Sequence, residues 1–273
     1  MGYPEGGERV SLRDLATKRA DRTSTTTSLI TLIDEHLENR SNGKRRPGYH
    51  PSEIGYRFCP RLYALLGLGL LIGEKRIDAQ LQRTFDNGHY VHDRYHKYIR
   101  EIGGLLTERP EIVERGKKYG RKRFPLEVRL DHPVGITGNC DAILELDNFL
   151  EIDDWKSSKQ EVFMGLFQPL GYNEKQLTVY LGMLDTLYEG DPPLPLRGRI
   201  LYENKNDGSL REFIVPWDDH HRMIFDQLVR YLEIVNQAVE QNTPELAPCI
   251  ESCGSCDGYD IAALREKPKT VRM

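Results

Sequence analysis

One stretch of the sequence places two carboxylates and a lysine at a spacing that could hold a metal ion. The segments GNCDAILEL and FLEIDDWK have strand-like composition and flank Asp147-Asn148, which favours a tight hairpin turn. With a two-residue turn there, Leu146 faces Phe149, and counting back places Asp141 opposite Asp154. Directly opposed residues have Cβ atoms about 4.5–5.5 Å apart. Two ionised carboxylates this close repel each other unless one is protonated or a cation lies between them.

Lys156 adds a positive charge to the same face of the hairpin, because side chains two residues apart in a strand point the same way. Hard divalent ions take one or two carboxylates and keep positions for water and phosphate. The pattern therefore indicates a metal site that cuts phosphodiesters. A surface hairpin with a salt bridge is the alternative, and a bulge would move Asp141 away from Asp154 and bring in Asp153.

Three further side chains could complete such a site. His92 lies on the apolar stripe of a long predicted helix and points inward, either as a core histidine or as a third metal ligand. Gly88, one turn earlier, would let another backbone approach. Gln176 and Tyr180 are four residues apart on one helix face and either line the site or form a surface pair.

The elements that must position these residues follow from hydrophobic periodicity. Helices are predicted over residues 27–43, 59–69, 78–104, 174–190 and 218–241. Strands are predicted over residues 106–114, 124–132, 135–146, 148–156, 197–206 and 210–217. This order is typical of an α+β or mixed α/β fold.

The same pattern predicts the domain organisation. Residues 1–27 are polar and rich in Thr and Ser, which indicates a flexible leader, and residues 261–273 form a tail. Residues 28–260 are expected to form a single domain with a core at about 80–216.

The composition limits the classes of partner. The 273 residues include 38 Lys and Arg against 42 Asp and Glu, a formal charge of −4, so a nucleic-acid partner must be bound by a local basic surface. No apolar run is long enough for a membrane span, and no secretory signal opens the chain. We expect a protein of the cytoplasm, of a bacterium or of a phage-infected host cell.

The five cysteines are an odd number in a chain without an export signal, which argues against a disulfide framework. Three of them lie close together in PCIESCGSCDGYDI, and clustered thiols in a reducing compartment more often hold a metal. Unliganded cysteines are the alternative.

Taken in order, these motifs resemble the PD-(D/E)XK nuclease superfamily, in its RecB-like branch. The resemblance rests on Gly88-x-x-x-His92, Gly138-Asn-Cys-Asp141, Asp154-Trp-Lys156 and Gln176-Leu-x-x-Tyr180, and it covers roughly residues 50–260. It implies a restriction-endonuclease-like core, with a central mixed sheet flanked by helices, plus helical and cysteine-bearing additions.

The resemblance also implies roles for individual residues. His92, Asp141, Asp154 and the backbone carbonyl of Trp155 would be ligands of a catalytic Mg²⁺ or Mn²⁺. Asp141 and Asp154 would share catalysis with Lys156, Gln176 and Tyr180. The sequence departs from the family pattern at Cys140, which stands where the name-giving proline would be.

The cysteines resemble those of the iron–sulfur subgroup, which includes AddB-type, CRISPR-adaptation and phage-borne nucleases. The resemblance implies a [4Fe–4S] cluster on Cys59, Cys249, Cys253 and Cys256, joining the two ends of the chain around the core. The C-x₃-C-x₂-C spacing departs from the usual pattern of that subgroup, so Zn²⁺ is the alternative structural metal.

These features predict a metal-dependent DNA exonuclease that acts on single-stranded DNA or DNA ends, in recombination, repair or phage DNA processing. The chain lacks a Walker motif, so any helicase or recombination motor would be a separate partner. A non-catalytic or endonuclease-type DNA-binding module of a larger complex is the alternative. The candidate DNA contacts are Lys44, Arg45, Arg46, Tyr56, Arg57 and Arg61.

Overall fold

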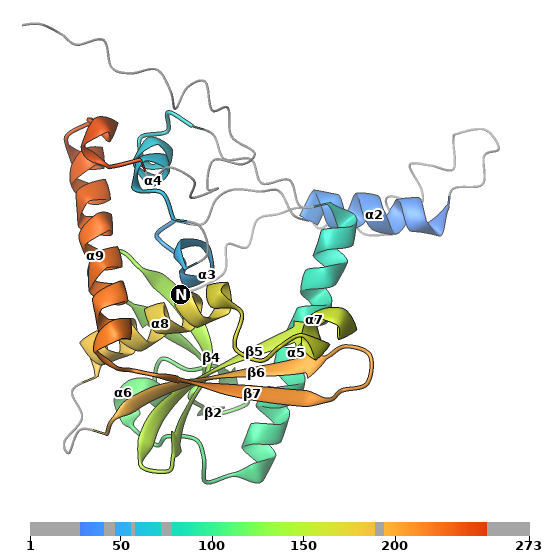
Figure 1. The fold of residues 1–273 in the computed structure, drawn as a ribbon. Helices are drawn as coiled ribbons and strands as arrows, with labels where there is room; N and C mark the ends of the chain where they lie inside the picture. Colours follow the sequence, from blue (N-terminus) through green and yellow to red (C-terminus); the bar gives the residue numbers. More distant parts are fainter. Residues whose placement is uncertain (1–27, 41–46, 56–57, 72–77, 189–193, 250–273) are drawn as a thin grey trace, which may run out of the picture. The chain divides into compact units, whose positions relative to one another are not determined.

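The computed structural model describes residues 28–40, 47–55, 58–71, 78–188 and 194–249, which belong to two units (Figure 1). The first unit contains helix α2 (Leu29–Arg40) and the start of helix α5 (Ala79–Ile102). An ion pair between Arg83 and Asp34 connects these two helices. The second unit contains the remaining described elements and all the candidate site residues that the structure describes.

A five-stranded mixed sheet forms the centre of the second unit. Its strands lie in chain order: β3 (Leu126–Asp131), β4 (Thr137–Leu146), β5 (Phe149–Ser158), β6 (Leu196–Asn204) and β7 (Leu210–Pro216). Neighbouring strands are antiparallel except β5 and β6, which are parallel. A parallel pair needs a crossover connection, and here the crossover carries helices α7 (Gln160–Met164) and α8 (Gly171–Leu187). The predicted α+β class with a mixed sheet is confirmed.

The remaining elements surround this sheet. Short helices α3 (Pro51–Ile54), α4 (Pro60–Gly67) and α6 (Pro110–Val113) each begin with proline at the first helical position, where a missing N–H costs nothing. Strands β1 (Lys118–Tyr119) and β2 (Lys122–Arg123) form a separate hairpin. The long helix α9 (Asp219–Glu240) is followed by the 3₁₀ helix η1 (Pro244–Leu246).

Helices cover both faces of the sheet, as Figure 1 shows for α5 on one side and α8 with α9 on the other. The larger core packs α8 and α9 against sheet residues such as Ile152 and Ile200. The smaller core packs Val91 and Tyr95 of α5 against Trp155 and its neighbours. Burial on both faces explains why the central strand β5 is almost continuously buried.

The predicted hairpin turn is confirmed. Asp147 and Asn148 both have positive φ, 54° and 64°, which is the conformation of a two-residue type I′ turn. The strand register pairs Leu146 with Phe149, as predicted, and continues regularly to Ala142, which pairs with Asp153. Asp141 and Asp154 are the next residues in that register.

The predicted strand over residues 106–114 is wrong. Its second half is helix α6, because Pro110 favours a helix start and cannot donate to a strand ladder. Within residues 106–114, strand-like pairing is limited to Leu106, which forms an isolated bridge to Leu144 of β4. Helices α3 and α7 and the β1–β2 hairpin are not predicted from the sequence, because all of them are too short to show a period. Within the described ranges, no helix combines the length and apolarity needed to cross a membrane.

Candidate active site

Asp141 lies at the centre of the candidate site, with contacts to two different elements. Its Oδ1 lies 3.1 Å from Nδ1 of His92 on α5. Its Oδ2 accepts a hydrogen bond of 2.6 Å from the backbone N–H of Trp155 on β5. Burial opposes ionisation of Asp141, but the hydrogen bond and positive charge of His92, with the charge of Lys156, hold its pKa below the ordinary value.

Asp154 has the opposite electrostatic character. Burial, together with the negative charge of Asp141, raises its pKa although the ammonium group of Lys156 lowers it. The side chain is 3% exposed, and both of its oxygens lie 2.8 Å from Nζ of Lys156, which donates a hydrogen bond to Oδ1. The two carboxylates are therefore unequal: Asp141 is stabilised as the anion, whereas Asp154 carries a charge that is only partly compensated.

Lys156 reaches the same carboxylate from the surface side. Its Nζ lies 2.8 Å from Asp154, and its side chain is 23% exposed. Burial lowers the pKa of Lys156, but Asp154 and Asp141 more than offset this and raise it. The two carboxylates thus favour the ammonium form of Lys156.

His92 is brought to Asp141 by the packing of α5. The rings of His92, Tyr95 and His96 all lie against Trp155, with centroid distances of 6.2, 5.5 and 5.2 Å. Burial lowers the pKa of His92, but Asp141 outweighs this effect and raises it. The inward orientation predicted for His92 is confirmed. Gly88 has a different environment from the predicted one, since a Cβ added there would meet nothing within 4 Å among the described atoms.

Trp155 contributes its backbone and its ring to the site in different ways. The ring is 1% exposed and forms the surface on which α5 packs. The backbone pairs with Leu201 in the parallel ladder and donates its N–H to Asp141. A ligand role for its carbonyl oxygen stays a prediction.

Gln176 and Tyr180 lie on α8, facing the start of β4. The Tyr180 hydroxyl donates a 2.8 Å hydrogen bond to the carbonyl of Asn139, and the ring lies so close to Gly138 that a Cβ there would be 3.0 Å from it. Burial and the charge of Asp154 raise the pKa of Tyr180, and a hydrogen bond with Gln176 opposes this. Tyr180 thus contacts the backbone of β4 two residues before Asp141, and a role of Gln176 and Tyr180 in the site stays a prediction.

Asp153 is kept out of the site by its position on the other face of β5. It is 4% exposed, and burial together with Glu151 raises its pKa well above the ordinary value. Glu151 in turn is fully buried and ion-paired with Arg197 and Arg199 of β6. The alternative in which a bulge brings Asp153 to Asp141 is therefore wrong.

A third buried acid, Glu203, lies next to the site; its spacing from Lys205 on one strand face is compatible with a part in the site or with a surface ion pair. Glu203 of β6, 8% exposed, receives hydrogen bonds from Arg94 and from the Tyr95 hydroxyl of α5. Glu203 pairs with Ser157 in the β5–β6 ladder, two residues beyond Trp155. It fixes α5 over the end of β5. The sequence holds no local signal for this contact, because the partners are 109 residues apart.

A cavity of about 360 Å³ adjoins the start of β4. Asn139 and Tyr180 belong to both the cavity and the surroundings of Asp141. His50 is 8% exposed, with Nδ1 3.0 Å from the carbonyl of Thr137. The cavity lining consists of Pro47, His50, Pro51, Ser52, Arg129, Thr137, Gly138, Asn139 and Tyr180.

Two of the four predicted cluster cysteines lie in the described part of the chain. Cys59 is buried at the start of α4, and Cys249 is exposed directly after Pro248. The segments that carry them are bonded to each other, since the Arg61 N–H donates to Pro248 O at 3.2 Å. Cys253 and Cys256 lie outside the described residues. Cys140 is buried in the larger core.

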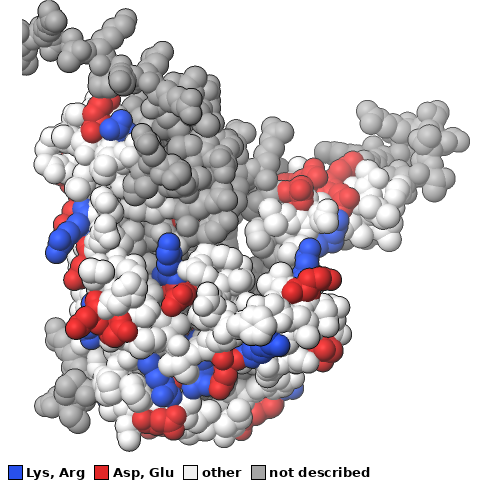
Figure 2. All heavy atoms as spheres, viewed as in Figure 1, with Lys and Arg blue, Asp and Glu red and all other residues white. Residues whose placement is uncertain are grey.

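Most of the predicted DNA contacts lie outside the described residues. These are Lys44, Arg45, Arg46, Tyr56 and Arg57. Arg61 is described, and its guanidinium donates to the backbone carbonyls of Ala247 at 2.6 Å and Glu245 at 3.0 Å. On the face drawn in Figure 2, basic and acidic side chains lie interspersed over the described surface.

A family model described as the PD-(D/E)XK nuclease superfamily matches residues 74–260. No curated protein matches the chain. The crystal structure of SSO0001 is similar over 90% of this chain and 98% of that one, with 15% identity and a TM-score of 0.42. The alkaline exonuclease LHK-Exo from Laribacter hongkongensis is similar over 78% of this chain and 100% of its own, with 16% identity and a TM-score of 0.43. Since the family match spans more than half of the sequence and includes the whole β4–β5 hairpin, the chain belongs to the PD-(D/E)XK nuclease superfamily.

Proposed function

We propose that the protein is a metal-dependent DNA exonuclease of the RecB-like branch. The observation that carries this proposal is the pair of buried carboxylates, Asp141 and Asp154, with opposite pKa shifts and with Lys156 beside them. Such unequal acids beside a fixed cation are a common feature of sites that do acid–base and charge-stabilisation chemistry.

The chain's own donors fit a catalytic Mg²⁺ or Mn²⁺. His92 Nδ1, the carboxylates of Asp141 and Asp154 and the carbonyl of Trp155 would hold the ion. The fit is supported by Asp154, because burial and the charge of Asp141 raise its pKa despite the ion pair with Lys156, so a bound cation would stabilise its anion. When bound, the ion would supply positive charge to the scissile phosphate and lower the pKa of an attacking water.

Lys156 would act on the substrate directly. Its raised pKa keeps the ammonium charged, and its partial exposure leaves donors free to face a phosphate oxygen. Donors aimed at charge that develops in the transition state are worth more in a buried site than in water. Lys156 would therefore stabilise the developing charge on phosphorus oxygens, while Asp154 keeps its Nζ in place.

The cavity beside Asn139 would receive the DNA strand. Its volume of about 360 Å³ lies within the usual range for a small-ligand site. Tyr180 supports one wall through its hydrogen bond to Asn139, two residues before Asp141. We propose that a nucleotide of a single strand or a DNA end enters here, and that Gln176 and Tyr180 hold the β4 backbone in register with it.

The cysteines would hold a structural [4Fe–4S] cluster, with Zn²⁺ as the alternative. Support comes from the bonds between Arg61 and residues 245–248, which bring the segments of Cys59 and Cys249 together. Purified protein would show the broad visible absorption of a cluster and bound iron, and Cys59→Ser would lose both. Cys140→Ala, in the core, would keep them; bound zinc without iron would select the alternative.

In the cell, we propose a cytoplasmic role in recombination, repair or phage DNA processing, in which a separate helicase or recombination protein would supply the DNA ends.

The test of the activity is degradation of end-labelled linear DNA, single- and double-stranded, beside a closed circle, with Mg²⁺, Mn²⁺ or EDTA. We expect metal-dependent trimming of linear DNA by the wild type and none by Asp154→Asn. Lys205→Ala is a matched control, because Lys205 is an exposed lysine of the same sheet region and lies outside the site. Cutting of the circle would make the protein an endonuclease, and binding without cleavage would make it a DNA-binding module.

A further inference from the structure

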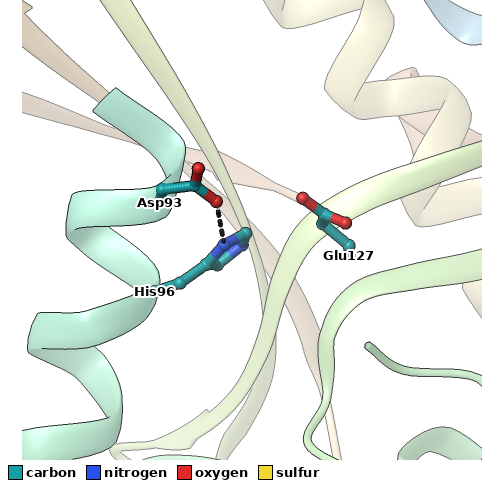
Figure 3. Close-up of side chains that lie close together, drawn as sticks. All are labelled: Asp93, His96 and Glu127. Atoms are coloured by element: carbon teal, nitrogen blue, oxygen red, sulfur yellow. Dashed lines mark ion pairs between the residues drawn. The ribbon is translucent and has the colours of Figure 1, made fainter. Parts of the chain in front are cut away.

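A second group of metal-binding side chains lies behind the Asp141 peptide and has no part in the proposed function. Asp93 and His96 come from α5 and Glu127 from β3, and all three point toward one another (Figure 3). One ligand atom from each lies within 4.8 Å of the others. The group contains one imidazole nitrogen and two carboxylates.

His96 points into this group with an unused nitrogen. The side chain has no exposed surface, and its Nε2 lies 3.2 Å from the carbonyl oxygen of Asp141. A carbonyl can only accept, so Nε2 carries the hydrogen and Nδ1 carries a lone pair. Nδ1 has no hydrogen-bond partner among the described residues and lies 4.0 Å from Oδ1 of Asp93. Buried nitrogens without a partner are rare, and this one faces two carboxylates.

The hydrogen bond on the far side of the ring is the one that metal-ligating histidines usually make. Such histidines donate their second ring N–H to a carboxylate or a backbone carbonyl, which fixes the tautomer and orients the free nitrogen. In His96 that acceptor is the carbonyl of Asp141. The ring is also fixed by its contact with Trp155, so Nδ1 is held in one direction.

Lys117 currently neutralises the two carboxylates. Its Nζ lies 3.0 Å from Glu127 and 3.5 Å from Asp93, and its side chain is 34% exposed. The lysine leaves the His96 nitrogen without a partner. A metal ion would use all three groups at once, and the lysine could move into solvent.

We propose that Asp93, His96 and Glu127 form a second divalent-cation site, separate from the Asp141–Asp154 pair, which takes a transition ion such as Zn²⁺ in place of the Lys117 ammonium. One imidazole and two carboxylates are ligands that suit Zn²⁺. Bonds of about 2.0–2.2 Å require the ligand atoms to draw together, and Asp93, 63% exposed, is free to do so. Water would complete the coordination.

Occupation of this site would connect α5 to β3 directly behind the active centre. The ion would hold the His96 ring, and through it the carbonyl of Asp141, in a fixed position. The site therefore stabilises the arrangement of α5 on the sheet, and its existence does not depend on nuclease activity.

The test measures Zn²⁺ bound per chain by equilibrium dialysis, in the wild-type chain and in an Asp154→Asn chain, because the catalytic ligand set can also hold Zn²⁺ and Asp154→Asn disrupts it. Any zinc on the cysteines is common to all variants. In both backgrounds we expect Asp93→Asn and His96→Asn each to bind one ion fewer than the parent chain. Asp93 is exposed, so its variant folds even if His96→Asn does not.

The variant Lys117→Met best distinguishes a lysine that competes with a metal ion from a lysine that is the permanent partner of the two carboxylates. If the lysine competes with the ion, its removal tightens zinc binding by about tenfold or more. If Lys117 is the permanent partner of the carboxylates and no metal binds, the variant leaves zinc binding unchanged or weakens it. That result, or an equal number of bound ions in the wild type and Asp93→Asn, would overturn the proposal.

Discussion

The carboxylate of Asp141 accepts the backbone N–H of Trp155 at 2.6 Å, so a side chain of β4 takes a hydrogen bond from the main chain of β5. This contact occurs just where the regular pairing of the hairpin ends, at Ala142 and Asp153. It keeps the Asp141 anion beside Asp154, although burial and charge repulsion oppose that placement. The hairpin thus holds two carboxyl groups close together whose pKa values are shifted in opposite directions, down for Asp141 and up for Asp154.

The first prediction concerns Lys156, whose Nζ lies 2.8 Å from Asp154. Lys156→Met keeps the aliphatic stem but removes the cation that would stabilise charge on the phosphate. We expect kcat for DNA cleavage to fall by about 10²–10³-fold, the usual effect of losing one such donor. Single-turnover cleavage at saturating Mg²⁺ measures this. If Lys156→Met keeps its activity and its thermal unfolding is unchanged, Lys156 has no role in catalysis.

The second prediction concerns pH and His92. Asp141 raises the pKa of His92 above 6.5, so in the metal-free protein their ion pair stabilises the fold below that pH. This contribution is lost as the pH rises through the raised pKa. Metal binding needs the neutral imidazole, so Mg²⁺ affinity should rise by up to about tenfold per pH unit until His92 is deprotonated.

Titration of Mg²⁺ binding between pH 6 and 9 checks this dependence. His92→Asn, which cannot titrate, should bind Mg²⁺ more weakly and with a flatter pH profile. An equally steep profile in His92→Asn would mean that another group controls the affinity.

Much of this site could be predicted because its signals are local. The turn at Asp147-Asn148 determines the hairpin register by itself, and the register brings Asp141 to Asp154. The contacts that could not be predicted join distant segments. Glu203 bonds to Arg94 across 109 residues, and no sequence period shows that β5 and β6 are parallel. Asp153 and Asp154 differ only in which face of β5 they occupy.

The third prediction separates those two aspartates. Burial and Glu151 raise the pKa of Asp153 far above 3.8, so the folded protein retains a proton that the unfolded chain releases. Stability is therefore lost as the pH rises from the unfolded value toward the folded one. Asp153→Asn removes this cost and can still donate to Glu151, so it should stabilise the fold by about 1 kcal/mol or more near pH 7.

Urea unfolding of the wild type and Asp153→Asn at pH 5 and pH 8 tests the sign, because the gain should be larger at pH 8. DNA cleavage by Asp153→Asn should persist, since the carboxylate lies on the opposite face of β5 from Asp154. A loss of stability at pH 8 would show that Asp153 is ionised and paired in the fold.

The fourth prediction is that Arg61 stabilises the fold and does not serve as a DNA contact. Its guanidinium donates to the carbonyls of Ala247 and Glu245, which holds the C-terminal segment against α4. Arg61→Ala should lower the free energy of unfolding by about 1.5–3 kcal/mol, the usual value for a hydrogen bond to a charged group. A variant with normal stability but weaker, less salt-dependent DNA binding would restore the DNA-contact role.

The fifth prediction compares two glycines within helices. A Cβ at Gly182 of α8 would lie 2.2 Å from the ring of Phe225 on α9, whereas a Cβ at Gly88 of α5 would meet nothing within 4 Å. Gly88→Ala should therefore stabilise the protein by about 0.5–1 kcal/mol, because alanine restricts the unfolded chain. Gly182→Ala gains the same propensity but forces α8 and α9 apart, and overpacking of this kind costs about 1–3 kcal/mol or more. Thermal unfolding of both variants measures the difference. Two variants shifted equally would mean that the α8–α9 interface is looser than the contact between Gly182 and Phe225 implies.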